Sequence, residues 1–196
     1  MLLDFTKPFA ALSQFTREVE THPTLADFGF AKGVYGIGRL DRDSEGLLLL
    51  SDDPSWTDKL LNPRRGHSRT YWAQVDGAAD EAALARLRRG VRLKEFTARP
   101  CQARLLGAET VEQALWPRVP PVRYRASIPT TWIELELTEG KNRQVRRMTA
   151  AVGHPTLRLG RGAIGRLNLL ELGLQPGEWR ALSQGEEQLV LAAPQA

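Results

Sequence analysis

Cysteine is almost absent from this chain of 196 residues, which contains only Cys101. A lone cysteine excludes an internal disulfide and provides no zinc-ligand cluster, so the reducing cytoplasm fits best. No apolar run approaches the roughly 18–20 residues that cross a bilayer, and we expect no membrane partner. The N-terminal stretch MLLDFTKPFAAL is interrupted by Asp4 and Lys7, which excludes a signal peptide. No repeat or linker divides the chain, so we expect one domain over residues 1–196.

Acidic charge is scarce in the middle of the chain, although the formal net charge of the whole is only +4. Residues 1–61 carry a net charge of −4, residues 62–166 of +11 and residues 167–196 of −3. Of the 20 basic residues in the middle segment, 18 are arginines, whose planar guanidinium suits phosphates and base stacking. A genome rich in G and C would favour arginine codons, but it would not confine the surplus to one segment. The middle segment therefore predicts a polyanionic partner.

Hydrophobic periodicity predicts strands and helices that mix without a strict βαβ alternation, which favours an α+β fold. Helices are expected at 80–90, between the cap residue Asp80 and Gly90, and at 142–155, starting at Asn142. Strands are expected where apolar residues alternate or run together, at 33–40, 47–50, 69–77, 131–140 and 156–172.

The stretch GRLDRDSEGLLLLSDD (38–53) places Asp41, Asp43 and Glu45 directly before four leucines that can only be core. Counted from Asp41, the acids and Gly46 follow the spacing of an EF-hand calcium loop. The flanks oppose that interpretation, because GVYGIG cannot form the required helix and leucines fill ligand positions. Arg42 inside the loop also repels a divalent cation. The acids therefore form a solvated turn, or one of them performs chemistry.

A second cluster, EGKNRQVRRM (139–148), crowds Lys141, Arg143, Arg146 and Arg147 into the first turns of the predicted helix. The helix macrodipole is already positive there, and each cation costs about 0.3–1 kcal/mol. A solvated basic face is one explanation; a site for phosphates or a carboxylate is the other. An arginine beside an acid in a closed pocket keeps the acid ionised against desolvation, as a carboxylate nucleophile requires.

The two stretches GRLDRDSEGLLLL and EGKNRQVRRM together resemble the pair of signatures of the pseudouridine synthases of the RsuA type. The resemblance continues through TKPF (6–9), RTYWAQVDG (69–77) and LRRGVRLKEFTARPCQARL (87–105). WPRVPPVRYRASIPTTW (116–132) and GHPTLRLGRGAIG (153–165) resemble the RluE-type branch, which modifies large-subunit ribosomal RNA. The implied fold is a mixed, mostly antiparallel sheet flanked by helices, with two lobes around a catalytic cleft.

The resemblance implies an isomerase that converts a specific uridine of 23S ribosomal RNA, near the peptidyl transferase region, to pseudouridine. Such enzymes detach uracil from C1′, rotate it and rejoin it through C5, without cofactor or metal. By the motif match, Asp41 is the catalytic aspartate, which acts as nucleophile or stabilises a glycal-type intermediate. Tyr71 would stack on the target base, and its hydroxyl could serve as a base towards the sugar. Arg146 is the basic residue expected to pair with Asp41.

Ribosomal RNA of the large subunit, or its precursor, is the implied partner, bound by a monomer. A uridine must leave its stack to reach an aspartate, at a cost of a few kcal/mol, and backbone contacts have to offset that cost. The segment WPRVPPVRYR interleaves aromatic residues with arginines, and we expect it to form an RNA-facing loop. The expected RNA contacts are Arg39, Arg42, Arg118, Arg123, Arg125, Lys141, Arg143 and Arg147.

Three features depart from the family pattern. The Lys-Pro signature begins at Lys7, so we expect no small RNA-binding domain of the S4 type before it. Thr6 replaces the usual asparagine, and Asp52-Asp53-Pro54 replaces the customary Asn-Asp-Gly. These changes affect local loops and none of the three expected catalytic positions.

Two functions from other classes also fit the sequence. A catalytically silent RNA-binding or ribosome-assembly factor on the same fold would keep the arginines and tolerate loss of Asp41. A metal-dependent nuclease would use Asp41, Asp43 and Asp52. In the isomerase interpretation, Asp43 instead holds the turn or an arginine such as Arg39 or Arg42.

Overall fold

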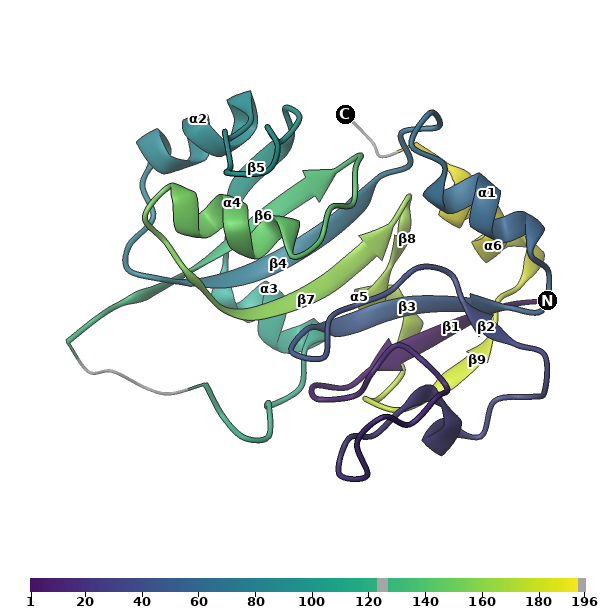
Figure 1. Ribbon diagram of the computed structural model, residues 1–196. Coiled ribbons are helices and arrows are strands. Elements are labelled where there is room, and N and C mark those ends of the chain that lie inside the picture. The colour runs from purple at the N-terminus through teal and green to yellow at the C-terminus, as the bar shows by residue number, and fades with distance from the viewer. Residues whose placement is uncertain (123–126, 194–196) are drawn as a thin grey trace.

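The computed structural model describes residues 1–122 and 127–193, and a nine-stranded sheet forms its centre (Figure 1). The strands are β1 (Leu2–Lys7), β2 (Tyr35–Gly36), β3 (Glu45–Ser51), β4 (Arg69–Asp76), β5 (Gln102–Leu106), β6 (Thr130–Leu137), β7 (Thr156–Ile164), β8 (Leu167–Asn168) and β9 (Trp179–Ala181). Their order is β5-β6-β4-β7-β3-β1-β9, with β2 paired to β3 and β8 to β7. Every ladder between these strands is antiparallel except that of β3 and β7.

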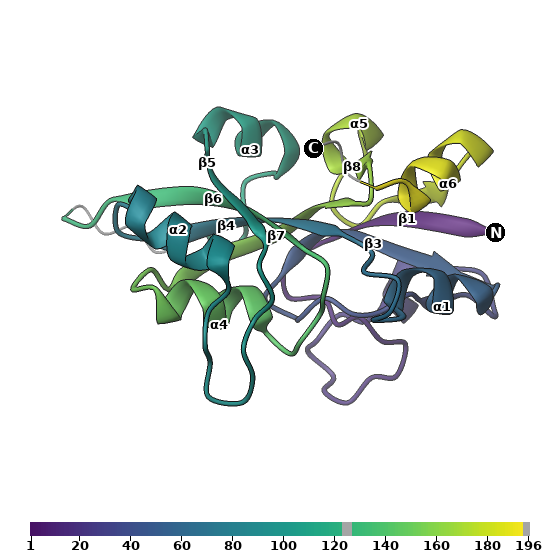
Figure 2. The ribbon, with the colours of Figure 1, turned by 90° about the horizontal axis from the view of Figure 1, so that it is seen from above.

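Helices cover both faces of the sheet. They are α1 (Ser55–Leu61), α2 (Glu81–Arg89), α3 (Ala108–Ala114), α4 (Gln144–Ala151), α5 (Leu169–Leu172) and α6 (Gln184–Leu191), with a 3₁₀ turn η1 at Leu25–Phe28. Seen from above, α3, α5 and α6 lie on one face, and α2 and α4 lie on the other beside the N-terminal segment 8–44 (Figure 2). No helix among the described residues has the length and apolarity to cross a membrane.

Two lobes share this sheet and confirm the expected α+β architecture. The α4 lobe consists of β4 to β7 with α2 and α4, and the N-terminal lobe consists of β1, β3 and β9 with segment 8–44 (Figure 1). The four leucines of β3 are fully buried, because Leu47 and Leu49 join one hydrophobic cluster while Leu48 and Leu50 join another on the opposite face. A strand covered on both faces reads as a continuous apolar run, so the predicted buried strand is confirmed.

The lobes join at a short parallel seam, where Glu45 pairs with Gly160 and Gly46 with Arg161. Gly46 has a φ of +95°, and a Cβ there would lie 2.4 Å from the carbonyl oxygen of Arg161. Only glycine therefore allows this approach. The seam lies directly after the acidic turn 38–44, which is thus anchored where the two lobes meet.

The predicted helices are present, but one begins later than expected. In α2, the Asp80 carboxylate accepts a hydrogen bond from the Ala83 N–H at 2.8 Å, and Gly90 ends the helix with a φ of +88°, as predicted. Helix α4 begins at Gln144 rather than Asn142, because Arg143 takes a left-handed conformation with φ 49° and ψ 35°. Left-handed backbone costs a residue with a Cβ about 1–2 kcal/mol, so tertiary contacts must hold Arg143 in place.

Some expected strands are also shorter than the pattern suggested. Of the strand expected at 33–40, only Tyr35–Gly36 pairs, as β2, and the rest enters the turn. The stretch expected to stay extended over 156–172 instead forms β7, a turn, β8 and α5. Glycines at both places give the backbone the freedom to leave the sheet.

Candidate active site

A cleft of about 640 Å³ opens between the two lobes. Its walls come from the acidic turn, from β4 and β7, and from the segment that leads into α4. Among the residues singled out in the sequence, those that line it are Arg39, Asp41, Arg42, Tyr71, Lys141, Arg143. The fold thus brings the acidic stretch 38–53 and the basic stretch 139–148, which lie about a hundred residues apart in the sequence, to the same cavity.

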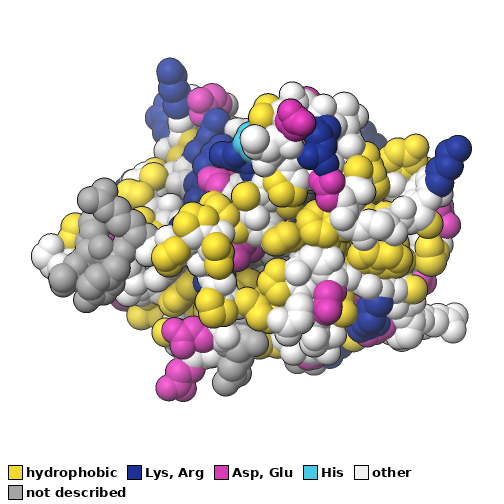
Figure 3. Space-filling model, turned by 90° about the horizontal axis from the view of Figure 1, so that it is seen from below, with side chains coloured by type: hydrophobic (Ala, Val, Ile, Leu, Met, Phe, Trp, Pro, Cys, Tyr) yellow, Lys and Arg dark blue, Asp and Glu magenta, His cyan; other side chains and the backbone are white. Residues whose placement is uncertain are grey.

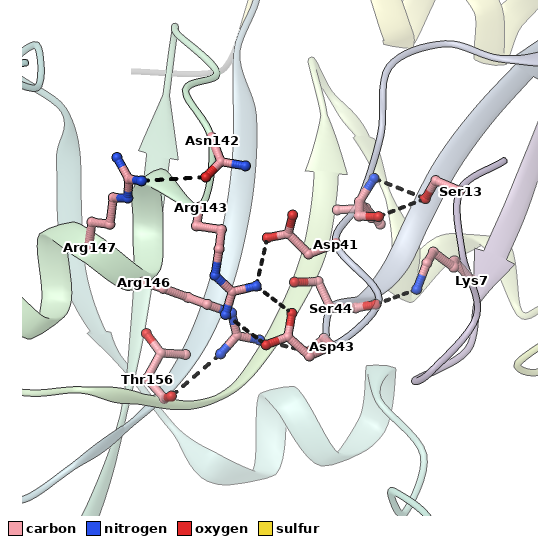
Figure 4. A network of polar contacts seen from close by, with 11 residues as sticks. Lys7, Ser13, Asp41, Asp43, Ser44, Asn142, Arg143, Arg146, Arg147 and Thr156 are labelled. Carbon is pink, nitrogen blue, oxygen red and sulfur yellow. Dashed lines mark hydrogen bonds and ion pairs between the residues drawn. The ribbon is translucent and has the colours of Figure 1, made fainter. Parts of the chain in front are cut away.

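The turn that carries Asp41 is fixed from three sides. The Ser44 N–H donates to the Asp41 carbonyl at 3.0 Å within the turn. Ser13 accepts from the Leu40 N–H and donates to the Leu40 carbonyl, at 3.0 and 2.8 Å. The Lys7 ammonium donates to the Ser44 carbonyl at 2.7 Å from the core side (Figure 4). The backbone is therefore rigidly held while the Asp41 side chain remains 34% exposed to the cleft.

Lys7 is a fully buried cation beneath the turn. Burial lowers its pKa to about 7, while the carboxylates of Glu45, Asp43 and Asp41 oppose that shift. The resemblance had marked Lys7 only as part of a signature. Its place shows that the signature provides a donor that holds the turn carrying Asp41.

Arg143 bridges the two acids of the turn. Its Nη1 and Nη2 each donate to an Asp43 carboxylate oxygen at 2.9 Å, and Nη1 lies 3.5 Å from Asp41 Oδ2 (Figure 4). Burial alone would raise the pKa of Asp43, but the hydrogen bonds from Arg143 and the charge of Arg146 outweigh burial and lower it. This clamp across the cleft also explains what holds Arg143 in its left-handed conformation.

Arg146 has a different partner from the expected one. Its Nη2 donates to the Asp43 carbonyl at 2.7 Å and lies 3.4 Å from Asp43 Oδ2, and its side chain is only 12% exposed. The ion pair expected between Arg146 and Asp41 is made by Arg143 instead. Asp43 likewise holds Arg143 and Arg146, and not Arg39 or Arg42 as expected. The reason is that Arg143, just before α4, and Arg146, in its first turn, both face the acidic turn, with Arg146 more deeply buried.

Tyr71 stands on β4 and lines the cleft with its side chain half-buried. Its neighbours in the sheet are Leu135 on β6 and Arg161 on β7. The flat ring is thus available at the cleft wall, and its role as a stacking surface stays a prediction.

The predicted RNA contacts divide into two groups. Arg39, Arg42 and Lys141 are exposed at the cleft, with Arg42 in contact with the His22 ring. Arg147 points away towards Glu95, with which it pairs at 3.1 Å.

Seen from below, basic side chains gather along the upper edge of the molecule, whereas hydrophobic side chains spread over the middle (Figure 3). Acidic side chains lie among these basic ones, and a further basic group lies at the lower right of the view.

The loop expected to face RNA uses one of its arginines internally. The Arg118 guanidinium lies 4.4 Å from the centre of the Phe9 ring and donates to the carbonyls of Pro120 and Pro121, at 2.8 and 3.0 Å. Arg123 and Arg125 lie outside the described residues. Arg118 thus ties the loop to the N-terminal lobe, and its RNA contact stays a prediction.

Sequence reasoning missed three arginines that line the cleft, Arg69, Arg99 and Arg161. A signal for Arg161 was present, because Leu157, Leu159 and Arg161 share one face of a strand by alternation. An arginine at a position where the pattern calls for an apolar residue marks a buried charge.

The fold and the cleft define an RNA-modifying isomerase, an assignment that comparisons with known proteins support. A solved structure described as a pseudouridylate synthase superimposes with a TM-score of 0.77 and 26% identity, over 96% of this chain and 73% of the other. The chain belongs to the RNA pseudouridylate synthase family, whose model matches residues 24–151. As a member of this family, it isomerises uridine to pseudouridine.

Two curated relatives share half of their aligned residues with this chain. The "Ribosomal large subunit pseudouridine synthase E" of Vibrio vulnificus is 50% identical over 182 residues, which cover 93% of this chain and 75% of that protein. The protein of the same name from Xanthomonas campestris pv. campestris is 50% identical over 181 residues, which cover 92% and 94%. The "Ribosomal small subunit pseudouridine synthase A" of Salmonella typhimurium is 32% identical over 168 residues, which cover 84% and 64%. The predicted family and fold are confirmed.

Proposed function

We propose that this chain converts one uridine of large-subunit ribosomal RNA, or of its precursor, to pseudouridine, with Asp41 as the catalytic carboxylate. The observation that carries the proposal is Asp41, which lines the cleft together with Tyr71 and lies 3.5 Å from Arg143. The choice of subunit rests on the higher identity to the large-subunit enzymes. The protein acts in the cytoplasm as a monomer, and its two lobes form one catalytic domain because a single sheet runs through both.

The reaction needs a carboxylate next to the sugar of a flipped uridine. Asp41 either attacks C1′ as the base departs, or supports loss of the C2′ proton to give a glycal. Uracil then rotates, and the C5–C1′ bond forms as the bond from Asp41 to C1′ breaks or as C2′ of the glycal regains its proton. The proton on C5 passes to water, and N1 takes up a proton. Bonds broken and formed balance, so no cofactor takes part. Tyr71 offers a stacking surface for the flipped base, which is worth about 1–3 kcal/mol for an aromatic under a base.

The basic residues of the cleft have separate parts in this proposal. Arg143 orients the Asp41 carboxylate and is itself 42% exposed, so it can also contact the phosphate of the flipped nucleotide. Arg39, Arg42 and Lys141 stand at the cleft, where they offer charge to the RNA backbone. Arg146 is a positioning residue that acts through Asp43 and the turn.

The nuclease alternative needs carboxylates that converge on a metal. Asp52 instead lies at the far end of β3, where it binds the N-terminal ammonium of Met1 at 2.7 Å. Asp43 is occupied by Arg143 and Arg146. Over residues 1–122 and 127–193, no three His, Cys, Asp or Glu side chains are grouped as metal ligands would be. This arrangement favours the isomerase.

The test is release of tritium to water from ribosomal RNA labelled at uridine C5, measured in EDTA. We expect release by the wild-type protein, none by Asp41→Asn, and full release by Asp52→Asn, a matched control from the same acidic stretch. No release from naked RNA, precursor particles or subunits, despite salt-sensitive binding, would favour the silent binding factor. Strand cleavage that appears when Mg²⁺ replaces EDTA, and that Asp52→Asn abolishes, would favour the nuclease.

A further inference from the structure

We propose that Arg161 is a catalytic cation that stabilises the negative charge on uracil when its bond to C1′ breaks. The inference rests on the proposed function and adds a residue that neither sequence signature contains. The starting observation is the buried guanidinium of Arg161, whose burial is energetically unfavourable and is not required by the fold.

Arg161 is a buried charge without a counter-ion. Its residue is only 4% exposed, and none of the ion pairs formed between described residues includes it. Its Nε donates to the Leu47 carbonyl at 2.7 Å, but its buried Nη2 has no hydrogen-bond partner among the described residues. Burial lowers the pKa of Arg161, which means that the charged form is held against an unfavourable environment. Native proteins rarely leave such a donor unpaired, so it calls for a functional explanation.

The position of Arg161 connects this charge with the reaction. In the sheet it lies directly opposite Tyr71 on β4 and beside Gly46 on β3, and it contributes to the cleft wall with Tyr71 and Asp41. The Tyr71 side chain opposes the lowering of the Arg161 pKa, through its charge interaction and its hydrogen bond with the guanidinium. The positive charge of Arg69 is a further cause that lowers the pKa of Arg161. The floor of the cleft is therefore electropositive before any substrate arrives.

The reaction forms a transient uracil anion in the part of the cleft that Tyr71 and Arg161 line. When the C1′–N1 bond breaks, its electron pair leaves with uracil and spreads over N1, O2 and O4. A base stacked on Tyr71 brings its carbonyl edge towards the neighbouring guanidinium, whose N–H groups can only donate. When the C5–C1′ bond forms, the base is neutral again, and it stays neutral because N1 takes up a proton as C5 loses its own. The cation thus favours the intermediate over both substrate and product, which is the condition for catalysis.

A purely structural role for Arg161 would be to hold the seam through the Leu47 carbonyl. That role needs a hydrogen-bond donor but no charge, so three substitutions separate the two. Arg161→Met keeps much of the length and removes donor and charge. Arg161→Gln keeps a neutral donor, and Arg161→Lys keeps the charge.

The experiment measures single-turnover conversion and RNA affinity of these variants, with thermal unfolding to verify that each is folded. We expect Arg161→Met to lower the rate about 10²–10³-fold, as loss of a donor to a developing anion does elsewhere. RNA affinity should stay nearly unchanged, because the buried guanidinium cannot reach a phosphate. Arg161→Lys should be about tenfold faster than Arg161→Gln, because the charge matters more than the donor. Equal rates for Lys and Gln would overturn the proposal, and this comparison holds even if the Met variant fails to fold.

A substrate change provides the second readout. Fluorine at C5 withdraws electrons and stabilises the uracil anion, so 5-fluorouridine in the target position makes the base a better leaving group. The deficit of Arg161→Met, measured as loss of the N-linked nucleoside in one turnover, should then shrink at least about fivefold relative to uridine. An unchanged deficit would indicate a structural role. If the wild-type protein converts neither RNA, the proposed function fails; if it is active and Arg161→Met matches it, only this inference fails.

Discussion

The ion pair between Glu45 and Arg158 joins the two lobes at the parallel seam, and its loss should destabilise the fold more than loss of any surface pair. Both side chains are only 11% exposed. Arg158 donates Nε and Nη2 to the two Glu45 carboxylate oxygens at 2.8 and 2.9 Å, and Nη2 also to the Trp116 carbonyl at 2.6 Å. Glu45→Gln leaves the guanidinium buried without its counter-charge. We therefore expect a loss of about 3–5 kcal/mol in the free energy of unfolding.

A double-mutant cycle shows how much of that loss belongs to the pair. Replacing both partners, as Glu45→Gln with Arg158→Met, leaves no isolated charge, so the double variant should lose less than the sum of the two single variants. Arg65→Gln is the control, because it breaks the exposed pair with Asp58, in which both side chains are more than half exposed. Such a surface pair should contribute no resolvable stability.

Urea unfolding followed by tryptophan fluorescence provides the measurement, since the chain has five tryptophans. A loss below about 1 kcal/mol in Glu45→Gln would refute the argument, because it would place the pair among screened surface pairs. Additive losses in the cycle would refute it as well, since they would mean that the two side chains do not interact.

Two further predictions use the same unfolding assay. Because burial lowers the pKa of Lys7 to about 7, the unfolded chain holds this proton up to higher pH than the folded chain. The free energy of unfolding should therefore fall as the pH is lowered through 8.5 to 7.5, by up to about 1.4 kcal/mol per unit, and less steeply in Lys7→Met; equal slopes would contradict this. Gly46→Ala should cost at least about 2 kcal/mol through clash with the Arg161 carbonyl. Gly153→Ala, with a similar φ of +97° and nothing within 4 Å, is its control; equal losses would exclude the clash.

The clamp around Asp43 gives the cleft its shape. Arg143 and Arg146 reach from α4 to a turn that precedes them by about a hundred residues, and Lys7 holds the same turn from the core. The two lobes are thus connected by ion pairs on the cleft side and by the seam behind it. Asp41 stands between these connections, where its carboxylate stays accessible while its backbone cannot move freely.

Local sequence determined a large part of this protein. The leucine run indicated a strand buried on both faces, and Asp80 with Gly90 delimited α2, because an apolar run and helix caps are local features of the sequence. The signatures around Asp41 and Arg143 indicated the family and the cleft. These features depend on periodicity, helix caps and motifs, all of which are local patterns in the amino-acid sequence.

Tertiary structure alone decided which charges meet. Arg143 and Arg146 stand one helical turn apart, and the sequence offers no means of choosing the partner of Asp41 between them. The left-handed backbone at Arg143 and the packing of α4 against the turn made that choice. Arg161 became a buried cation at the cleft, with no counter-ion among the described residues, because β3 and β7 meet beside it in parallel. Contacts between residues about a hundred positions apart depend on how the lobes pack, and local patterns do not contain that information.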